Sequence, residues 1–309
     1  MLFKKLTLFS YSIIVVLCAN AQMHTNHREE PLTDINGATE LNITLGANNL
    51  LGDLGGNLGI GQNGLKDYMW KTMRPLGGIG LTKYKTSWLG INAGLNISAV
   101  TGVDSFINNQ GGLERWRYYR NLSFKSSIIE GYIKADIYPL MIINKYAEIY
   151  QVSPFVTAGV GFFHFNPKAN LNGTWVPLQP LHTEGQGFAE YPERKPYALT
   201  QIYIPLSLGV KYYFNNHWAL SGGMNMRVTF TDYIDDASTT YIDPTLFYKY
   251  LPADQAAIAK QLYERSRTPE KVKPGIDRAH SNNKDSYLTF FLTLSLRLGQ
   301  GVRFYYGGM

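Results

Sequence analysis

The side chains that could do chemistry are few and scattered. The six histidines stand apart, and no two have the four-residue spacing by which one face of a helix binds zinc. They are His24, His27, His164, His182, His217 and His280. The single cysteine, Cys18, lies in an N-terminal segment that we expect to be removed, so the mature chain has no thiol to bind a metal or attack a substrate.

One stretch, FTDYIDDAST at 230–239, gathers three carboxylates, Asp232, Asp235 and Asp236. Carboxylate oxygens are calcium ligands, so the stretch could bind that ion. We favour the alternative, a solvated or turn-forming loop start. His182 and Glu184 share another loop, but no serine, histidine and acid can be assembled into a catalytic set. The sequence therefore predicts no catalytic, cofactor-binding or metal-binding residue, and a protein that is not an enzyme.

The N-terminus has the pattern of a secretory signal peptide. Two lysines precede an apolar run, and the motif Ala19-Asn20-Ala21 follows it. We expect cleavage after Ala21, so that 1–21 is the signal peptide and 22–38 is a periplasmic N-terminal segment. A lipoprotein would need a small residue in front of Cys18, where Leu17 stands.

Apolar residues alternate with polar or small residues in eight segments of the mature chain. In WLGINAGLNISAV, Leu95 and Ile97 fall on one face of a strand, whereas Asn92 and Asn96 fall on the other. The segments are 39–47, 74–84, 88–100, 125–138, 153–165, 200–214, 218–231 and 287–298. Several reach the roughly 9–11 residues with which a tilted strand crosses a bilayer. No later segment approaches the roughly 18 apolar residues of a transmembrane helix, so a membrane-spanning chain of this kind must be a barrel.

The connections between these segments alternate in length. Those at 48–73, 101–124, 165–198 and 232–285 are long, and the links near 85–87, 139–151 and 215–216 are short or moderate. Long outer loops and short periplasmic turns are typical of outer-membrane barrels. We therefore predict an all-β fold, an eight-stranded antiparallel up-and-down transmembrane β-barrel over 39–298 that contacts outer-membrane lipid. A C-terminal tail at 299–309 would be periplasmic. The formal net charge of +6 indicates no nucleic-acid partner.

Extending the strand alternation places seven charged residues on inward faces. They are Glu40, Glu130, Lys134, Asp136, Lys211, Arg227 and Arg297. Side chains about fill the interior of an eight-stranded barrel, so we expect these charges to pair as a buried network that plugs the lumen. A proton or ion path through them is the alternative.

The loops and the tail offer further surfaces. Residues 253–266 read as a short helix, and the polar, proline-bearing stretch 265–286 is expected to be mobile. Aromatic residues of the loops could form a ligand or adhesion surface, or pack the loops together; they are Trp116, Tyr118, Tyr119, Trp175 and Tyr241. In the tail, Phe304, Tyr305 and Tyr306 could dock on a periplasmic partner or serve barrel insertion.

Several blocks of the chain resemble one known family. They are NNLLGDLG (48–55), YRNLSFKSSIIE (119–130), FVTAGVGFFHFNPKA (155–169), WVPLQPLHTEGQG (175–187), YALTQIYIPLSLGVKY (197–212), RVTFTDYIDDASTTYID (227–243) and NNKDSYLTF (282–290). Together they resemble the Bacteroidota outer-membrane β-barrel family that includes the PorG component of the type IX secretion system. The resemblance implies an eight-stranded barrel that associates with periplasmic ring proteins of the PorK and PorN type.

Two functions follow as hypotheses. The first is a non-enzymatic anchor or accessory barrel of a periplasmic or outer-membrane assembly, in keeping with the resemblance to a type IX secretion component. The second is an independent surface-binding or small-solute transport barrel that uses its aromatic-rich loops. Proteins that come with the barrel out of the envelope would separate the two.

Overall fold

The computed structural model describes residues 35–55, 68–107, 112, 114–143, 151–280 and 284–299. The predicted signal peptide, most of the segment 22–38 and the tail residues Phe304, Tyr305 and Tyr306 lie outside the described residues. Within the described ranges, no helix is long and apolar enough to cross a membrane.

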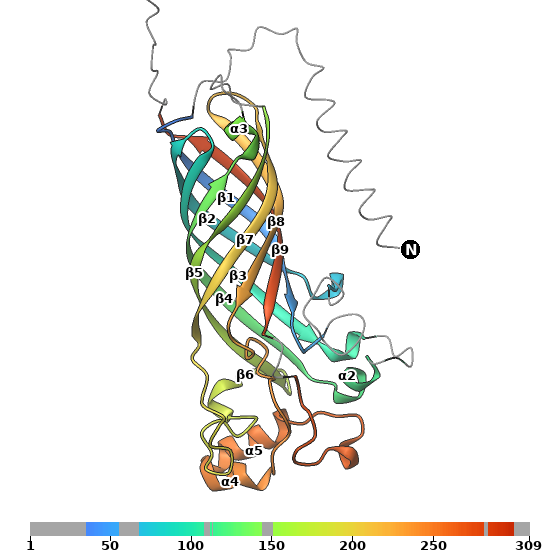
Figure 1. Cartoon of the computed structure of the whole chain (residues 1–309). Helices are drawn as coiled ribbons and strands as arrows, with labels where there is room; N and C mark the ends of the chain where they lie inside the picture. The colour runs from blue at the N-terminus through green and yellow to red at the C-terminus, as the bar shows by residue number, and fades with distance from the viewer. Residues whose placement is uncertain are drawn as a thin grey trace, which may run out of the picture.

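Eight strands form a closed antiparallel barrel, and this confirms the predicted fold (Figure 1). They are β1 (Thr39–Leu51), β2 (Arg74–Thr86), β3 (Leu89–Val103), β4 (Ser123–Ile137), β5 (Val152–Leu171), β7 (Thr200–Tyr213), β8 (Trp218–Thr229) and β9 (Ser286–Arg297). Each of these strands pairs with the next one around the wall, and the β1–β9 pairing closes the cylinder. Closure gives each of these eight strands a partner on both sides, as a bilayer requires.

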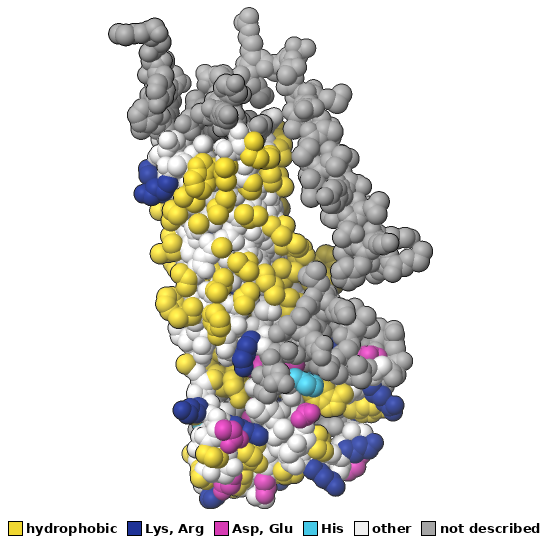
Figure 2. Space-filling view, in the orientation of Figure 1, with side chains coloured by type: hydrophobic (Ala, Val, Ile, Leu, Met, Phe, Trp, Pro, Cys, Tyr) yellow, Lys and Arg dark blue, Asp and Glu magenta, His cyan; other side chains and the backbone are white. Residues whose placement is uncertain are grey.

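The outer wall of the barrel is apolar because the alternation of the sequence sets which side chains point outward. On β3, Leu95 and Ile97 are 60% and 67% exposed, whereas Asn92 and Asn96 on the opposite face are buried. On the face that it shows, Figure 2 has the same pattern as a hydrophobic band over the wall, with most charged side chains of that face gathered beyond one end of the band. This band is the lipid-facing surface of a transmembrane β-barrel.

One strand differs from its prediction. The sequence pattern predicts an end near 165 for β5, but the strand continues to Leu171 and turns back into a short strand, β6 (Thr174–Pro177). Asn172 and Gly173 form the two-residue turn with φ values of 50° and 92°. Asn-Gly is the sequence that favours such turns, because both residues tolerate positive φ.

The long loops carry most of the helical structure. The α-helices are α2 (Arg115–Arg120), α4 (Thr245–Tyr250) and α5 (Ala253–Leu262), and the 3-10 helices are η2 (Trp70–Thr72), η3 (Asp104–Phe106), η4 (Gln179–Leu181) and η5 (Pro269–Lys271). One further helix, α3 (Pro139–Ile143), lies at the opposite end of the barrel (Figure 1). The predicted helix at 253–266 is therefore present as α5, and it ends earlier, at Leu262.

We call the described residues of 104–122, 172–199 and 230–285 the outer cap. The cap has its own hydrophobic core, in which Phe247, Ala259 and Ile242 are completely buried. This core continues into the barrel through Phe163, Phe165 and other inward rings. The loops are therefore packed as one layer over the barrel mouth.

Candidate functional site

The seven charged residues predicted to face the lumen do lie on its inner face, and six of them are at most 6% exposed. Near the periplasmic end, Lys211 donates a hydrogen bond to Glu40 and another, of 2.9 Å, to the Tyr84 hydroxyl. The Tyr84 hydroxyl in turn donates to Glu40 at 3.0 Å. Arg297 lies opposite Glu40 in the β1–β9 register. These residues form one charged layer.

A second charged layer crosses the middle of the lumen. Arg227 on β8 donates to the Glu130 carboxylate on β4 from Nη2 at 3.1 Å and from Nε at 3.2 Å. Asn96 donates to the same carboxylate at 2.8 Å, and the Tyr287 hydroxyl donates to it as well. A buried ion pair needs such added hydrogen bonds to offset its loss of water.

The last two predicted residues form a pair of their own. Lys134 Nζ lies 4.0 Å from the Asp136 carboxylate, which also accepts hydrogen bonds from Asn92 at 3.2 Å and Thr157 at 2.9 Å. Two cavities of about 40 and 30 Å³ lie beside these residues in the lumen. Each has room for only a few water molecules.

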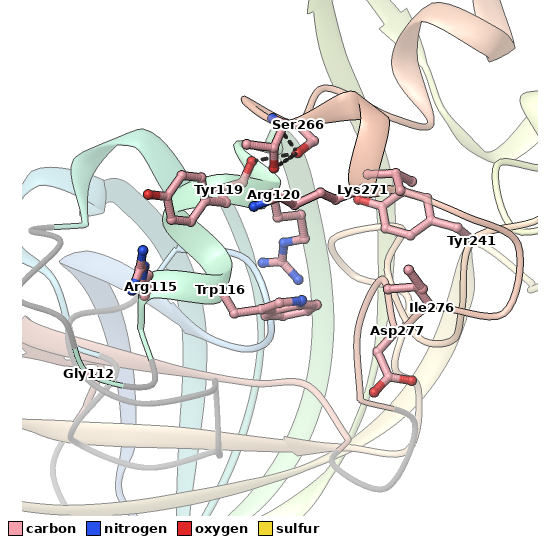
Figure 3. A pocket seen from close by; sticks show the side chains of 12 residues that line it. Gly112, Arg115, Trp116, Tyr119, Arg120, Tyr241, Ser266, Lys271, Ile276 and Asp277 are labelled. Atoms are coloured by element: carbon pink, nitrogen blue, oxygen red, sulfur yellow. Dashed lines mark hydrogen bonds between the residues drawn. The ribbon is translucent and has the colours of Figure 1, made fainter.

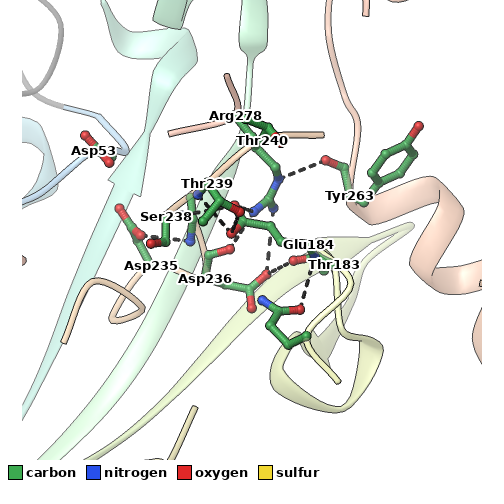
Figure 4. A network of polar contacts seen from close by, with 12 residues as sticks. Asp53, Thr183, Glu184, Asp235, Asp236, Ser238, Thr239, Thr240, Tyr263 and Arg278 are labelled. Atoms are coloured by element: carbon green, nitrogen blue, oxygen red, sulfur yellow. Dashed lines mark hydrogen bonds and ion pairs between the residues drawn. The ribbon is translucent and has the colours of Figure 1, made fainter. Parts of the chain in front are cut away.

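Charged residues also lie buried in the outer cap. The Arg278 guanidinium donates to the Glu184 carboxylate at 2.9 Å and lies 3.7 Å from the Asp236 carboxylate (Figure 4). Glu184 also accepts the backbone N–H groups of Ser238 and Thr239, each at 3.0 Å. Arg278 is 2% exposed. The prediction that 265–286 is a mobile polar stretch is therefore wrong for this residue, which joins two loops.

A second buried pair joins α2 to the loop that follows β3. Arg120 donates to both oxygens of the Asp104 carboxylate, at 2.8 and 3.0 Å. Arg120 also donates hydrogen bonds to the backbone carbonyls of Arg278 and Asp53, both of 2.7 Å. Arg120 therefore ties the loop after β3 to the end of β1 and to the last part of the cap.

Four aspartates gather where the cap meets the barrel, Asp53, Asp232, Asp235 and Asp285, and each is at most 3% exposed. Asp235 accepts the Leu54 N–H at 3.0 Å, and Asp285 accepts the Ile234 N–H at 2.9 Å. Desolvation, together with repulsion by neighbouring carboxylates, raises the pKa of Asp232 and of Asp235 to about 8. The same causes raise the pKa of Asp285 well above its usual range.

The sequence pattern favours a solvated or turn-forming loop start at 230–239. The chain does turn here, where the Asp236 N–H donates to the Tyr233 carbonyl at 3.2 Å, but the solvated part of the prediction is wrong. Asp232, Asp235 and Asp236 are 3%, 1% and 0% exposed. Burial raises the pKa of Asp236 to about 6, against the opposing effect of Arg278. Among the described residues, no three histidine, aspartate or glutamate side chains are grouped so that they could hold a metal ion.

The outer cap also contains a cavity of about 500 Å³ (Figure 3). One wall is α2, with Arg115, Trp116 and Tyr119, and the other includes Lys271 and Asp277. Three loop aromatics singled out from the sequence, Trp116, Tyr119 and Tyr241, meet here, whereas Tyr118 and Trp175 do not line the cavity. Its volume falls in the range of small-ligand pockets, roughly 300–1,000 Å³.

No pattern in the sequence signals the buried pairs of the cap. Glu184 stands out only as a neighbour of His182, and nothing near Arg278 marks it as buried. The two residues are 94 positions apart. Only the packing of the loops brings them together.

No protein-family model and no curated protein sequence matches the chain. Several solved barrels are similar in structure. Ail, the attachment invasion locus protein of Yersinia pestis, in complex with the heparin analogue sucrose octasulfate, has 8% identity and a TM-score of 0.37, over 85% of this chain and 99% of that one. Neisserial surface protein A has 7% identity and a TM-score of 0.35, over 85% and 98%. A major outer membrane protein from Thermus thermophilus has 13% identity and a TM-score of 0.35, over 84% and 100%. At these values no ligand or partner carries over to this chain.

Proposed function

We propose that the protein is a non-enzymatic, non-conducting outer-membrane barrel that anchors a periplasmic or outer-membrane assembly. The observation that carries this proposal is the filled lumen, crossed by layers of ion-paired side chains with cavities of about 40 and 30 Å³ beside them. A barrel that passes no solute works through the surfaces at its two ends. The blocks quoted above support type IX protein secretion as the assembly, with ring proteins of the PorK and PorN type as partners.

The test is a mild-detergent pull-down of the tagged full-length protein from its own envelope, followed by mass spectrometry. Recovery of PorK-like and PorN-like proteins with the barrel is the expected result. Recovery of the barrel alone, while intact rings are present in the same extract, contradicts the proposal.

A second candidate function is surface binding through the outer cap, and the cavity lined by Trp116, Tyr119 and Tyr241 favours it. The filled lumen weighs against the transport version of this hypothesis. Retention of a ligand by the refolded barrel, at one saturable site, is the measurement that supports surface binding.

A further inference from the structure

The cavity of the outer cap has cations at its mouth that are not neutralised within the cap. Arg115 and Lys271 come from opposite walls and are both exposed. Over the described ranges, neither makes an ion pair with a carboxylate. Arg120, deeper in the cavity, is already neutralised by Asp104. Two exposed cations that face one cavity favour an anionic occupant.

A buried hydroxyl also lacks a partner in this cavity. Tyr241 is 3% exposed and its hydroxyl makes no hydrogen bond with any described residue. Figure 3 shows this hydroxyl directed across the cavity toward Lys271. A buried polar group without a partner costs roughly 1–3 kcal/mol, and a bound ligand can relieve that cost.

The other residues that line the cavity favour some anions over others. Asp277 adds a carboxylate at the rim, which repels a bare phosphate or sulfate but accepts hydrogen bonds from hydroxyl groups. Tyr119 and Ile276 supply apolar surface, and Ile276 is 41% exposed. A ligand that matches cations, a carboxylate and apolar surface together carries an acidic group, hydroxyl groups and a C–H face. A sugar acid has all three.

The walls are also tied together. The Ser266 hydroxyl donates to the Tyr119 carbonyl at 3.0 Å, and the Arg267 N–H donates to the same carbonyl at 2.8 Å. Tyr241 exchanges backbone hydrogen bonds with Gly275 and Ile276, each of 2.9 Å. The backbone segments that carry the lining residues are therefore held in place before any ligand arrives, which lowers the entropy lost on binding.

We infer that this cavity binds an acidic sugar unit, with Arg115 and Lys271 contacting its acid group and Tyr241 donating to a ring or hydroxyl oxygen. The inference rests on the second proposed function and deepens it. The sugar can come from a free glycan or from a glycolipid headgroup of the outer leaflet, because both present the same chemistry.

The experiment uses the full-length mature barrel in phosphatidylcholine nanodiscs and measures binding of tetragalacturonic acid by calorimetry. Its fully methyl-esterified form is the matched neutral probe. We expect saturable binding of the acid and at least about tenfold weaker binding of the ester. Equal binding of the two probes, or no binding of the acid, overturns the inference.

Variants locate the site. Lys271→Ala is expected to weaken binding of the acid by about fivefold to tenfold. Lys273→Ala, an exposed residue of the same segment that does not line the cavity, is expected to have no effect. Tyr241→Phe removes a hydroxyl that makes no hydrogen bond with the described residues. We therefore expect this variant to bind the acid about threefold to tenfold more weakly and to keep the melting temperature of the wild type. Equal losses in the two lysine variants, or unchanged binding in Tyr241→Phe, contradict the assignment.

Nanodiscs that contain outer-membrane lipopolysaccharide separate the two sources of the sugar. Weaker apparent binding of the free acid in these discs identifies the glycolipid as the occupant, whereas unchanged binding identifies a free glycan. Failure of all sugar binding leaves the anchoring function standing, because the pull-down tests that function separately.

Discussion

Asp232 provides a test of how the outer cap is held to the barrel. Its side chain is 3% exposed, and one carboxylate oxygen accepts the Ser238 hydroxyl at 2.7 Å. The other oxygen makes no hydrogen bond with the described residues. Desolvation, together with repulsion by Asp235 and Asp53, raises its pKa to about 8. Asp232→Asn keeps the shape of the protonated acid and removes its titration.

The size of the effect on cap stability follows from the difference in the pKa of Asp232 between the closed and the opened cap. An aspartate in an opened, solvated loop has a pKa of about 4, so Asp232 by itself gives the closed cap one more proton than the opened cap between pH ~4 and ~8. The stability contributed by protonated Asp232 is therefore fully present below pH ~4 and is lost as the pH rises toward 8. One proton is worth about 1.4 kcal/mol per pH unit, which gives about 3 kcal/mol by pH 6 and at most about 5 kcal/mol by pH 8.

Hydrogen–deuterium exchange in lipid bilayers measures this effect. The backbone N–H of Thr239, which bonds to Glu184, reports opening of the cap. In the wild type, the free energy of cap opening should fall between pH 5 and 8, and Asp232→Asn should reduce that slope. Asp243→Asn is the control, because its contacts with Thr245 lower the pKa of Asp243 and leave it ionised over this range. Identical slopes in the wild type and Asp232→Asn would refute the reasoning, as would wild-type protection that increases with pH.

Three further predictions concern the barrel. Glu130→Leu should destabilise the folded barrel by about 3–5 kcal/mol in urea titrations, because it leaves Arg227 buried without its carboxylate, and Glu130→Leu/Arg227→Met should recover most of the loss. Gly159→Ala should destabilise by about 1–3 kcal/mol, because its Cβ would collide with the Ile133 carbonyl oxygen, whereas Gly77→Ala, with nothing within 4 Å, should be neutral in the same assay. The wild-type barrel should pass no single-channel current in planar bilayers, and steady conductance steps would rule out a plugged lumen.

The barrel wall could be predicted well from the sequence, because a period of two determines which side chains face lipid. Glu40 and Arg227 could be placed on inward faces for the same reason. The alternation of long and short connections also predicted which end of the barrel carries the large loops. Pairing partners could not be predicted, since Lys211 reaches Glu40 from 171 residues away. The local sequence pattern was also misleading in the cap. It suggested that Asp236 is solvated, but loops that are distant along the chain bury this residue.

The length of β5 sets how far the outer cap stands from the lipid. Its last large apolar side chain that faces lipid is Phe162, and the outward positions beyond it are polar, beginning with His164. The stretch from there to Leu171 spans roughly 23 Å along the strand, or about 18 Å along the membrane normal at the usual tilt. The β5–β6 turn at Asn172 therefore stands clear of the lipid, among any polysaccharide chains that cover the membrane surface. An epitope inserted at this turn should be reached by antibodies on intact cells even where such chains crowd the membrane surface.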